Sequence, residues 1–364
     1  MALSLRNIRD KARELAKGSC RVCQTCDGRA CPGEVPGMGG AGTGASFRQN
    51  VVALAEIKLN TRLVHGVSHP NTETEILGFK LKLPVMVGPI GVISLNLKGA
   101  MEETAYQEAI AFGAVDAGIV AGTPDAVPPE IMKIGLEVAE KVGQGRAIPF
   151  IKPWEPDKIK EKLEMAKKAG CHVVACDLDS VGLITLRLMG NPAYPKTQGE
   201  LAGIIKAAHG LGLAFIVKGI MGPEDAEACL EAGADGLVVS NHGGRVLDSV
   251  PGTAEVLPKV AERVGRQVAL LVDGGVRSGV DILKMLALGA DGVMIGRPYA
   301  VAAIGGGREG VALYTDNLRF QLEQAMIMTG SPSVKEIEPS VIYGLKNRAS
   351  FRPRPARVTN IGYL

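Results

Sequence analysis

Short apolar runs alternate with longer helical patterns along the chain from Pro84 onward. Eight of these runs have the length and the nearly continuous apolar character of buried strands. They cover residues 85–88, 117–121, 148–151, 172–176, 214–217, 236–239, 269–272 and 292–295. Because alternating strands and helices of this kind are typical of a parallel sheet covered by helices, the pattern predicts an α/β fold that closes into a (β/α)8 TIM barrel.

Apolar residues at helical spacing fill the intervals between several of these strands. The expected helices cover residues 157–169, 200–209, 223–232, 253–264 and 280–288, and a last helix over 310–328 closes the barrel. An open, doubly wound sheet is the alternative fold. The barrel is favoured because no Gly-x-Gly-x-x-Gly motif follows an early strand and because the charged strand ends lie in the second half of the chain.

The first fifty residues differ in pattern from the rest of the chain. Residues 1–17 place their apolar side chains on one helix face with charges between them, which predicts an amphipathic helix rather than a signal peptide. Gly, Pro and Cys dominate residues 18–44 and predict an irregular segment tied down through its cysteines. We expect three regions: a helical and Cys-rich extension at 1–50, the barrel at 51–345 and a basic tail at 346–364.

Bulk composition narrows the class of protein. The chain is 46% hydrophobic and 22% charged, as in globular proteins, and its net charge of +3 gives no electrostatic footprint for nucleic acid. The basic residues of the tail alternate with prolines and indicate a solvated arm. No apolar run reaches the roughly 18 residues that a membrane span needs, so we expect no membrane association and a cytoplasmic location with reduced thiols.

The last four strands on the barrel path each end in charge plus glycine. In barrels, the loops after the seventh and eighth strands commonly bind phosphate through backbone N–H groups. Here those loops carry glycines that let the backbone approach an anion and arginines that offer paired donors. The candidate residues of these two loops are Asp273, Gly275, Arg277, Gly296 and Arg297.

Three further side chains at these strand ends have complementary chemistry. Lys218 ends an apolar strand, so its ammonium would support negative charge that develops at the barrel rim, for example on a reduced flavin. His242 is a candidate base for a substrate hydroxyl, and Arg245, three residues later, is a candidate clamp for a carboxylate. The other histidines lack such neighbours and are interpreted as structural.

These motifs resemble the FMN-dependent 2-hydroxy acid dehydrogenase and oxidase family, which includes lactate oxidase and glycolate oxidase. The resemblance is specific over residues 214–330 and weaker over residues 47–93. It implies FMN on the barrel, Lys218 at the flavin, His242 as base and Arg245 on the substrate carboxylate. It also implies that Asp179 orients and stabilises the protonated histidine. The residues that it places along the flavin or its phosphate are Pro89, Ile90, Gly91, Ser240, Asp273, Gly275, Arg277, Gly296 and Arg297.

The sequence departs from the family at several substrate-binding positions. Two tyrosines that reach the substrate in the family are missing, one from residues 34–40 and one from residues 150–154. Arg187 is only an offset candidate for a second carboxylate-binding arginine, and Asp177 stands where the family usually has a threonine. These departures weaken the expectation of a 2-hydroxy acid substrate more than they weaken the expectation of a flavin cofactor.

Four cysteines form a second departure. Cys20, Cys23, Cys26 and Cys31 follow the spacing Cys-x2-Cys-x2-Cys-x4-Cys and precede Pro32, one residue longer than a bacterial ferredoxin-type run. An iron–sulfur cluster, a zinc ion and structural cysteines all remain open at this point. The other three, Cys171, Cys176 and Cys229, are interpreted as small core residues.

The sequence therefore supports three functional hypotheses. The first is FMN-dependent oxidation of a small, L-lactate-like 2-hydroxy acid to the 2-oxo acid. The second is a flavin and possible iron–sulfur reductase or electron-transfer enzyme that uses NAD(P)H or a ferredoxin, and the third is a barrel that binds a phosphorylated ligand without catalysis. The expected partners are a small substrate and a redox partner such as oxygen, NAD(P)H or an electron-transfer protein, and the resemblance implies a homo-oligomer, such as a tetramer.

Overall fold

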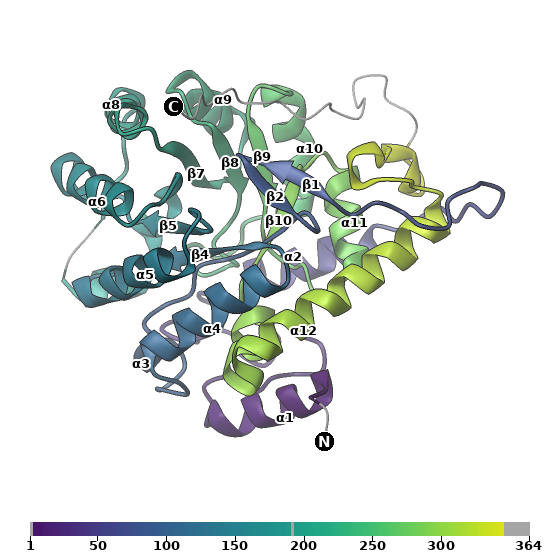
Figure 1. Cartoon of the computed structure of the whole chain (residues 1–364), viewed down its shortest axis with the longest axis horizontal. Coiled ribbons are helices and arrows are strands. Elements are labelled where there is room, and N and C mark those ends of the chain that lie inside the picture. The colour runs from purple at the N-terminus through teal and green to yellow at the C-terminus, as the bar shows by residue number, and fades with distance from the viewer. Residues whose placement is uncertain (1–2, 191–192, 346–364) are drawn as a thin grey trace.

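A closed barrel of eight parallel strands forms the centre of the protein (Figure 1). The computed structural model describes residues 3–190 and 193–345. The barrel strands are β3 (Val85–Val87), β4 (Val120–Pro124), β5 (Ala147–Ile151), β6 (Val173–Asp177), β7 (Ala214–Ile220), β8 (Gly236–Val239), β9 (Ala269–Val272) and β10 (Gly292–Ile295). β10 pairs with both β9 and β3, which closes the sheet and confirms the predicted TIM barrel.

One predicted strand lies three residues away from its expected start. β4 begins at Val120 rather than at Ala117, because Ala117 still caps the preceding helix and Gly118 turns the chain at φ 74°. The other seven predicted strands overlap the observed ones closely, since they are buried on both faces and carry the uninterrupted apolar pattern.

Helices surround the barrel on the outside (Figure 1). They are α3 (Ile93–Asn96), α4 (Glu103–Asp116), α5 (Pro129–Val142), α6 (Pro156–Lys168), α7 (Ile184–Leu188), α8 (Gln198–Gly210), α9 (Pro223–Glu231), α10 (Thr253–Val264), α11 (Gly279–Ala287) and α12 (Arg297–Thr329). Three short 3-10 turns are η1 (Leu178–Gly182), η2 (Val334–Glu336) and η3 (Pro339–Val341). None of the helices in the described chain is long and apolar enough to cross a membrane.

The last helix starts earlier than the sequence predicts. α12 begins at Arg297 and has non-helical dihedrals at Gly307, so two helical pieces meet there at a kink. The expected helix over 310–328 corresponds to the second piece. The first piece packs against α1 (Leu5–Leu15), where a side chain at Gly305 would clash with the carbonyl oxygen of Ile8.

A short antiparallel hairpin seals the amino-terminal end of the barrel. Its strands, β1 (Thr74–Ile76) and β2 (Phe79–Leu81), have no counterpart among the predicted elements. A Cβ on Gly292 would lie 2.7 Å from Ile76, and one on Gly236 would lie 3.2 Å from Leu77, so the hairpin rests on the first residues of β10 and β8. It continues the apolar cluster that fills the barrel interior.

The N-terminal extension is attached to the barrel through a second helix. α2 (Ala45–Glu56) crosses residue 50, the expected regional boundary, and residue 50 contacts Asn241 on the barrel. The carboxylate of Asp248 accepts hydrogen bonds from the backbone and hydroxyl of Thr43 and from the backbone of Ser46. Burial would raise the pKa of Asp248, but these bonds outweigh it and lower the pKa to about 2. The tail from residue 346 lies outside the described residues.

Candidate active site

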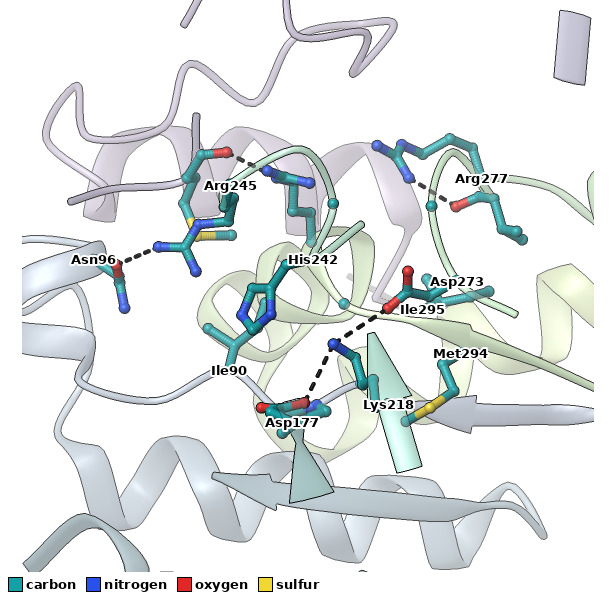
Figure 2. A pocket seen from close by; sticks show the side chains of 18 residues that line it. Ile90, Asn96, Asp177, Lys218, His242, Arg245, Asp273, Arg277, Met294 and Ile295 are labelled. Atoms are coloured by element: carbon teal, nitrogen blue, oxygen red, sulfur yellow. Dashed lines mark hydrogen bonds and ion pairs between the residues drawn. The ribbon is translucent and has the colours of Figure 1, made fainter. Parts of the chain in front are cut away.

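A cavity at the carboxyl-terminal end of the barrel brings together most of the predicted site residues (Figure 2). It contains about 750 Å³ of space, open solvent at its mouth included. Lys218 and His242, from the ends of β7 and β8, face the same space. The predicted residues that line it are Pro89, Ile90, Lys218, His242, Arg245, Asp273, Arg277, Gly296 and Arg297.

Lys218 lies at the bottom of this cavity between two carboxylates (Figure 2). Its Nζ is 3.3 Å from Asp177 and 3.8 Å from Asp273. Burial would lower the pKa of Lys218, but the surrounding carboxylates outweigh that effect and raise the pKa above its ordinary value. The ammonium is therefore a fixed positive charge throughout the physiological pH range.

A second buried lysine shares the carboxylate of Asp177. Lys152, directly after β5, places its Nζ 2.6 Å from Asp177, and both side chains are at most 10% exposed. Burial would raise the pKa of Asp177, but Lys152 and Lys218 together hold it below its ordinary range. Sequence reasoning missed Lys152, although it ends an apolar strand in the same way as Lys218 does.

His242 is backed by a carboxylate, as the family resemblance implies. Its Nδ1 lies 2.9 Å from Oδ1 of Asp179, which belongs to η1 directly after β6. Asp179 comes this close because Gly219 has no side chain: a Cβ there would lie 2.5 Å from the Cβ of Asp179. If Nδ1–H donates to Asp179, the opposite ring nitrogen, Nε2, is free to accept a proton.

The charge state of His242 follows from opposing effects. Burial lowers the pKa of His242, and Asp179 opposes this, while the ammonium of Lys218 adds to the lowering. The net direction is below the ordinary value of about 6.5. The imidazole is thus neutral at neutral pH and available as a base.

Arg245 also lines the cavity, on the side of His242 that faces Asn96 (Figure 2). One of its terminal nitrogens donates to the carbonyl oxygen of Gly37 at 3.0 Å and to the side-chain oxygen of Asn96 at 2.9 Å. Its Nε is buried and has no hydrogen-bond partner among the described residues. Burial lowers the pKa of Arg245 to about 10, so the group stays charged and keeps an unused donor for an anion.

Arg297 and Arg277 form the opposite end of the cavity. Arg297 donates to the carbonyl oxygens of Met38 and Gly39 and lies 3.8 Å above the ring of Phe47. Arg277 donates from Nε to the carbonyl oxygen of Cys26 at 3.2 Å. Burial lowers the pKa of Arg297 to about 10, the nearby thiols of the Cys-rich segment opposing and Arg277 adding to the effect. This end of the cavity therefore carries positive charge from two guanidinium groups, with the backbone of Gly296 beside them. We call it the arginine cradle.

Several predicted residues lie beside the cavity rather than in it. Ser240 donates to Asp273 at 2.9 Å and lines no part of the cavity. Gly275 packs against the backbone of Asn50, where a side chain would clash. This packing is enough to require a glycine here, and no contact with a phosphate is needed to explain it. Gly91 lines an adjoining cavity of about 590 Å³, which also touches His242.

The second carboxylate-binding arginine is not brought to the site. Arg187, on α7, is exposed and lines neither cavity. No tyrosine lines either cavity in the described chain, in agreement with the missing tyrosines noted in the sequence. Asn96 is a second residue that the sequence did not reveal, because its contact with Arg245 spans 149 positions.

The lining of the cavity fits FMN. The arginine cradle suits a doubly charged phosphate, and the apolar Ile90, Met294 and Ile295 suit the ring system. Burial raises the pKa of Asp273 to about 6, although Lys218 and the hydroxyl of Ser240 lower it. One oxygen of Asp273 is buried without a hydrogen-bond partner in the described residues, as expected where a polar group of a bound molecule completes the set.

The four N-terminal cysteines are free thiols of intermediate burial. Burial raises the pKa of Cys20, with the thiols of Cys26 and Cys23 adding to the effect, and it raises the pKa of Cys31 to about 11. Within the described residues, no three of these sulfurs lie within 4.8 Å of one another. No three of these thiols are thus close enough in the described residues to bind one ion together.

Comparison with known proteins agrees with this geometry. The L-lactate oxidase of Lacticaseibacillus rhamnosus is 31% identical, over 82% of this chain and 86% of that protein. The L-lactate dehydrogenase of Serratia proteamaculans is 29% identical, over 85% of this chain and 93% of that protein. A mandelate oxidase variant with a C4a-OH-FMN adduct superposes with a TM-score of 0.73 at 26% identity, covering 92% of this chain and 97% of that one.

A family match covers most of the barrel and part of the extension. The sequence matches the FMN-dependent dehydrogenases over residues 37–188 and 194–344, which include His242, Arg245, Lys218 and the loops that follow β9 and β10. The N-terminal cysteines lie outside the matched residues. Because its barrel, the residues of its site and this match agree, the chain belongs to the FMN-dependent dehydrogenase family.

Proposed function

We propose that this protein oxidises a small 2-hydroxy acid to the corresponding 2-oxo acid with FMN as cofactor. The observation that carries the proposal is the placement of a carboxylate-backed base, His242, next to a charged clamp with an unused donor, Arg245. Both face a cavity whose floor is the ammonium of Lys218. FMN supplies the hydride acceptor when it is bound in this cavity.

The chain's own residues divide the work of the reaction. Arg245 binds the substrate carboxylate, and Nε2 of His242 accepts the proton of the substrate hydroxyl. Asp179 stabilises the imidazolium that results. Lys218 favours the negative charge that accompanies reduction, because it is a preorganised cation in a water-poor site.

The cofactor would be held by the remaining predicted residues. Arg277, Arg297 and Gly296 would bind the phosphate, and Pro89 and Ile90 would lie along the ring system. The alternative, a reductase that accepts hydride from NAD(P)H, gives no use to a base paired with a carboxylate clamp, so the site does not favour it.

Anaerobic half-reactions test the proposal directly. Purified protein saturated with FMN is mixed without oxygen with L-lactate, glycolate, mandelate and longer 2-hydroxy acids, and the flavin absorbance is followed. We expect at least one of these acids to bleach the flavin and to yield the 2-oxo acid in equal amount. Absence of bleaching by every acid in the panel overturns the proposal.

Three finer expectations belong to the same proposal. We infer a cytoplasmic protein that assembles into a homo-oligomer, such as a tetramer, in line with the family resemblance; light scattering of the purified protein tests the assembly. We also infer that Cys20, Cys23, Cys26 and Cys31 hold a metal centre.

A further inference from the structure

The Cys-rich segment is held in place from two sides by arginines. From α1, Arg9 donates to the carbonyl oxygen of Cys23 at 2.5 Å, and Arg13 donates to that of Val22 at 3.0 Å. From the barrel, Arg277 donates to the carbonyl oxygen of Cys26. A loop with these ties has a defined path, and Arg277 also lies within hydrogen-bond distance of the Cys26 sulfur.

The four cysteines also differ from the other three of the chain. Cys171, Cys176 and Cys229 are buried in the fold, as core residues are, whereas the four of the segment are only half-buried and interact electrostatically with one another. Thiols gathered within twelve residues of sequence and without a disulfide among them are typical of metal ligands.

The spacing of the sulfurs separates the two metal hypotheses. A zinc–sulfur bond of about 2.3 Å in a tetrahedral site requires sulfurs about 3.8 Å apart. No three of the cysteine sulfurs lie within 4.8 Å of one another. In a four-iron cluster each thiolate binds a separate iron atom, so the cysteine sulfurs can lie farther apart than they do around one zinc ion. The described sulfurs are thus not arranged as one zinc ion requires, and the Cys-x2-Cys-x2-Cys-x4-Cys spacing followed by Pro32, close to a ferredoxin-type run, favours a cluster.

The position of the segment connects such a cluster to the flavin cavity. Arg277 lines that cavity, and its terminal nitrogen lies 3.7 Å from the sulfur of Cys26. Arg297 lines the cavity as well and interacts electrostatically with Cys20 and Cys31. A cluster with four thiolate ligands carries negative charge, which these guanidinium groups offset. The cluster and FMN would therefore share one wall.

We propose that Cys20, Cys23, Cys26 and Cys31 ligate an iron–sulfur cluster that takes electrons one at a time from reduced FMN. The electron-transfer half of this proposal rests on the proposed oxidation of a 2-hydroxy acid, whereas the cluster itself does not. The final acceptor is a one-electron carrier, a ferredoxin-like protein or a small oxidant.

The electrons and protons balance over one turnover. Oxidation of the 2-hydroxy acid breaks its C–H and O–H bonds, sending a hydride to FMN and a proton to His242. The cluster held by the four cysteines would accept the two electrons of the reduced cofactor one at a time. It would pass each electron to one molecule of the one-electron carrier, so that two carrier molecules are reduced per turnover, and both protons go to solvent.

Composition and magnetic resonance test the cluster without any substrate. The full-length protein is purified and reconstituted anaerobically with ferrous iron and sulfide, and then desalted. We expect iron and acid-labile sulfide in equal amounts, and a paramagnetic signal after reduction with dithionite. Cys23→Ser should lose most of the iron and the signal, while Cys229→Ala, a core cysteine on α9, should keep both. Zinc in place of iron, or equal iron in parent and Cys23→Ser, overturns the assignment.

Single-turnover and steady-state rates test the electron path. In Cys23→Ser we expect the hydroxy acid to bleach FMN at the parent rate, while reduction of a one-electron dye such as ferricyanide falls about tenfold or more. Equal loss of both rates, or loss of neither, overturns the path. If no hydroxy acid bleaches the parent protein, the proposed function has failed, and the iron and sulfide measurements still decide the cluster.

Discussion

The contact between Asp179 and His242 allows the function of the base to be tested by one substitution. Asp179→Asn keeps the size of the side chain and leaves an oxygen that can accept from Nδ1, but it removes the negative charge. The two atoms are 2.9 Å apart, and the side chains of His242 and Asp179 are only 13% and 9% exposed. The electrostatic effect of the substitution is therefore only weakly screened by solvent.

The magnitude follows from this distance. At an effective dielectric constant of about 20, two unit charges 2.9 Å apart attract each other by about 6 kcal/mol. This energy stabilises the imidazolium that forms as the hydroxyl proton is transferred. Since about 1.4 kcal/mol corresponds to a tenfold change in rate, the full loss would slow flavin reduction about 10⁴-fold. The dipole of asparagine recovers part of this energy, so we expect a loss of roughly 10³- to 10⁴-fold.

The assay is anaerobic stopped-flow measurement of flavin reduction at saturating substrate, repeated across pH. Asp179 raises the pKa of His242, so removing its charge lowers that pKa further. The acid limb of the pH profile should therefore move to lower pH in Asp179→Asn, while the plateau rate falls. A merely structural defect would lower the plateau without moving the limb.

A second aspartate–histidine pair supplies the control. Asp235 lies 2.8 Å from Nε2 of His209 on the outside of the barrel, away from the cavity. Asp235→Asn should reduce flavin at the parent rate once the protein is folded. The reasoning is refuted if Asp179→Asn reduces flavin within about threefold of the parent, or if the control variant is slowed as much.

Three further predictions concern the pH profile, the clamp and the fold. In the parent protein kcat/KM should be flat above pH about 6.5 and fall below the lowered pKa of His242, because the protonated imidazole accepts no proton; a profile that falls on raising the pH through 6.5 contradicts this. Arg245→Lys should raise KM about 10- to 100-fold with a smaller change in kcat, since an ammonium makes no paired bond to a carboxylate; steady-state kinetics check it, and an unchanged KM speaks against the clamp. Gly305→Ala should destabilise the protein by about 1–3 kcal/mol in denaturant unfolding, because its Cβ would clash with the backbone of α1, whereas Gly199→Ala, an open position in α8, should be neutral or stabilising; equal midpoints would contradict the close crossing.

The sequence predicted the barrel because its strands have the strongest local signal. The runs that became β8, β9 and β10 are buried on every residue or nearly so, and their bounds match the prediction. The hairpin of β1 and β2 escaped notice because each strand has only three residues and neither is buried throughout. Such short pieces are ordered by packing against the barrel, which no local pattern reveals.

The candidate site was predictable only in part, for a similar reason. Lys218 lies near the end of β7, and His242, Arg277 and Arg297 follow strands, so topology alone places them at one rim. Besides the contact of Arg245 with Asn96, the contacts that hold Arg245 and Arg297 come from the backbone carbonyls of Gly37, Met38 and Gly39, a group that every residue type has. Nothing in the identity of these three residues marks them as partners of an arginine more than two hundred positions away.

The hairpin that rests on β8 and β10 closes one end of the barrel. In the described chain, Ile76 and Leu77 cover its base, and the cavity lies at the opposite end, where we expect cofactor, substrate and product to enter and leave. An oxidant that has to touch the flavin must wait until the 2-oxo acid has left, which is the order of a ping-pong cycle. A carrier that takes electrons through the cysteine segment does not have to wait for release of the 2-oxo acid.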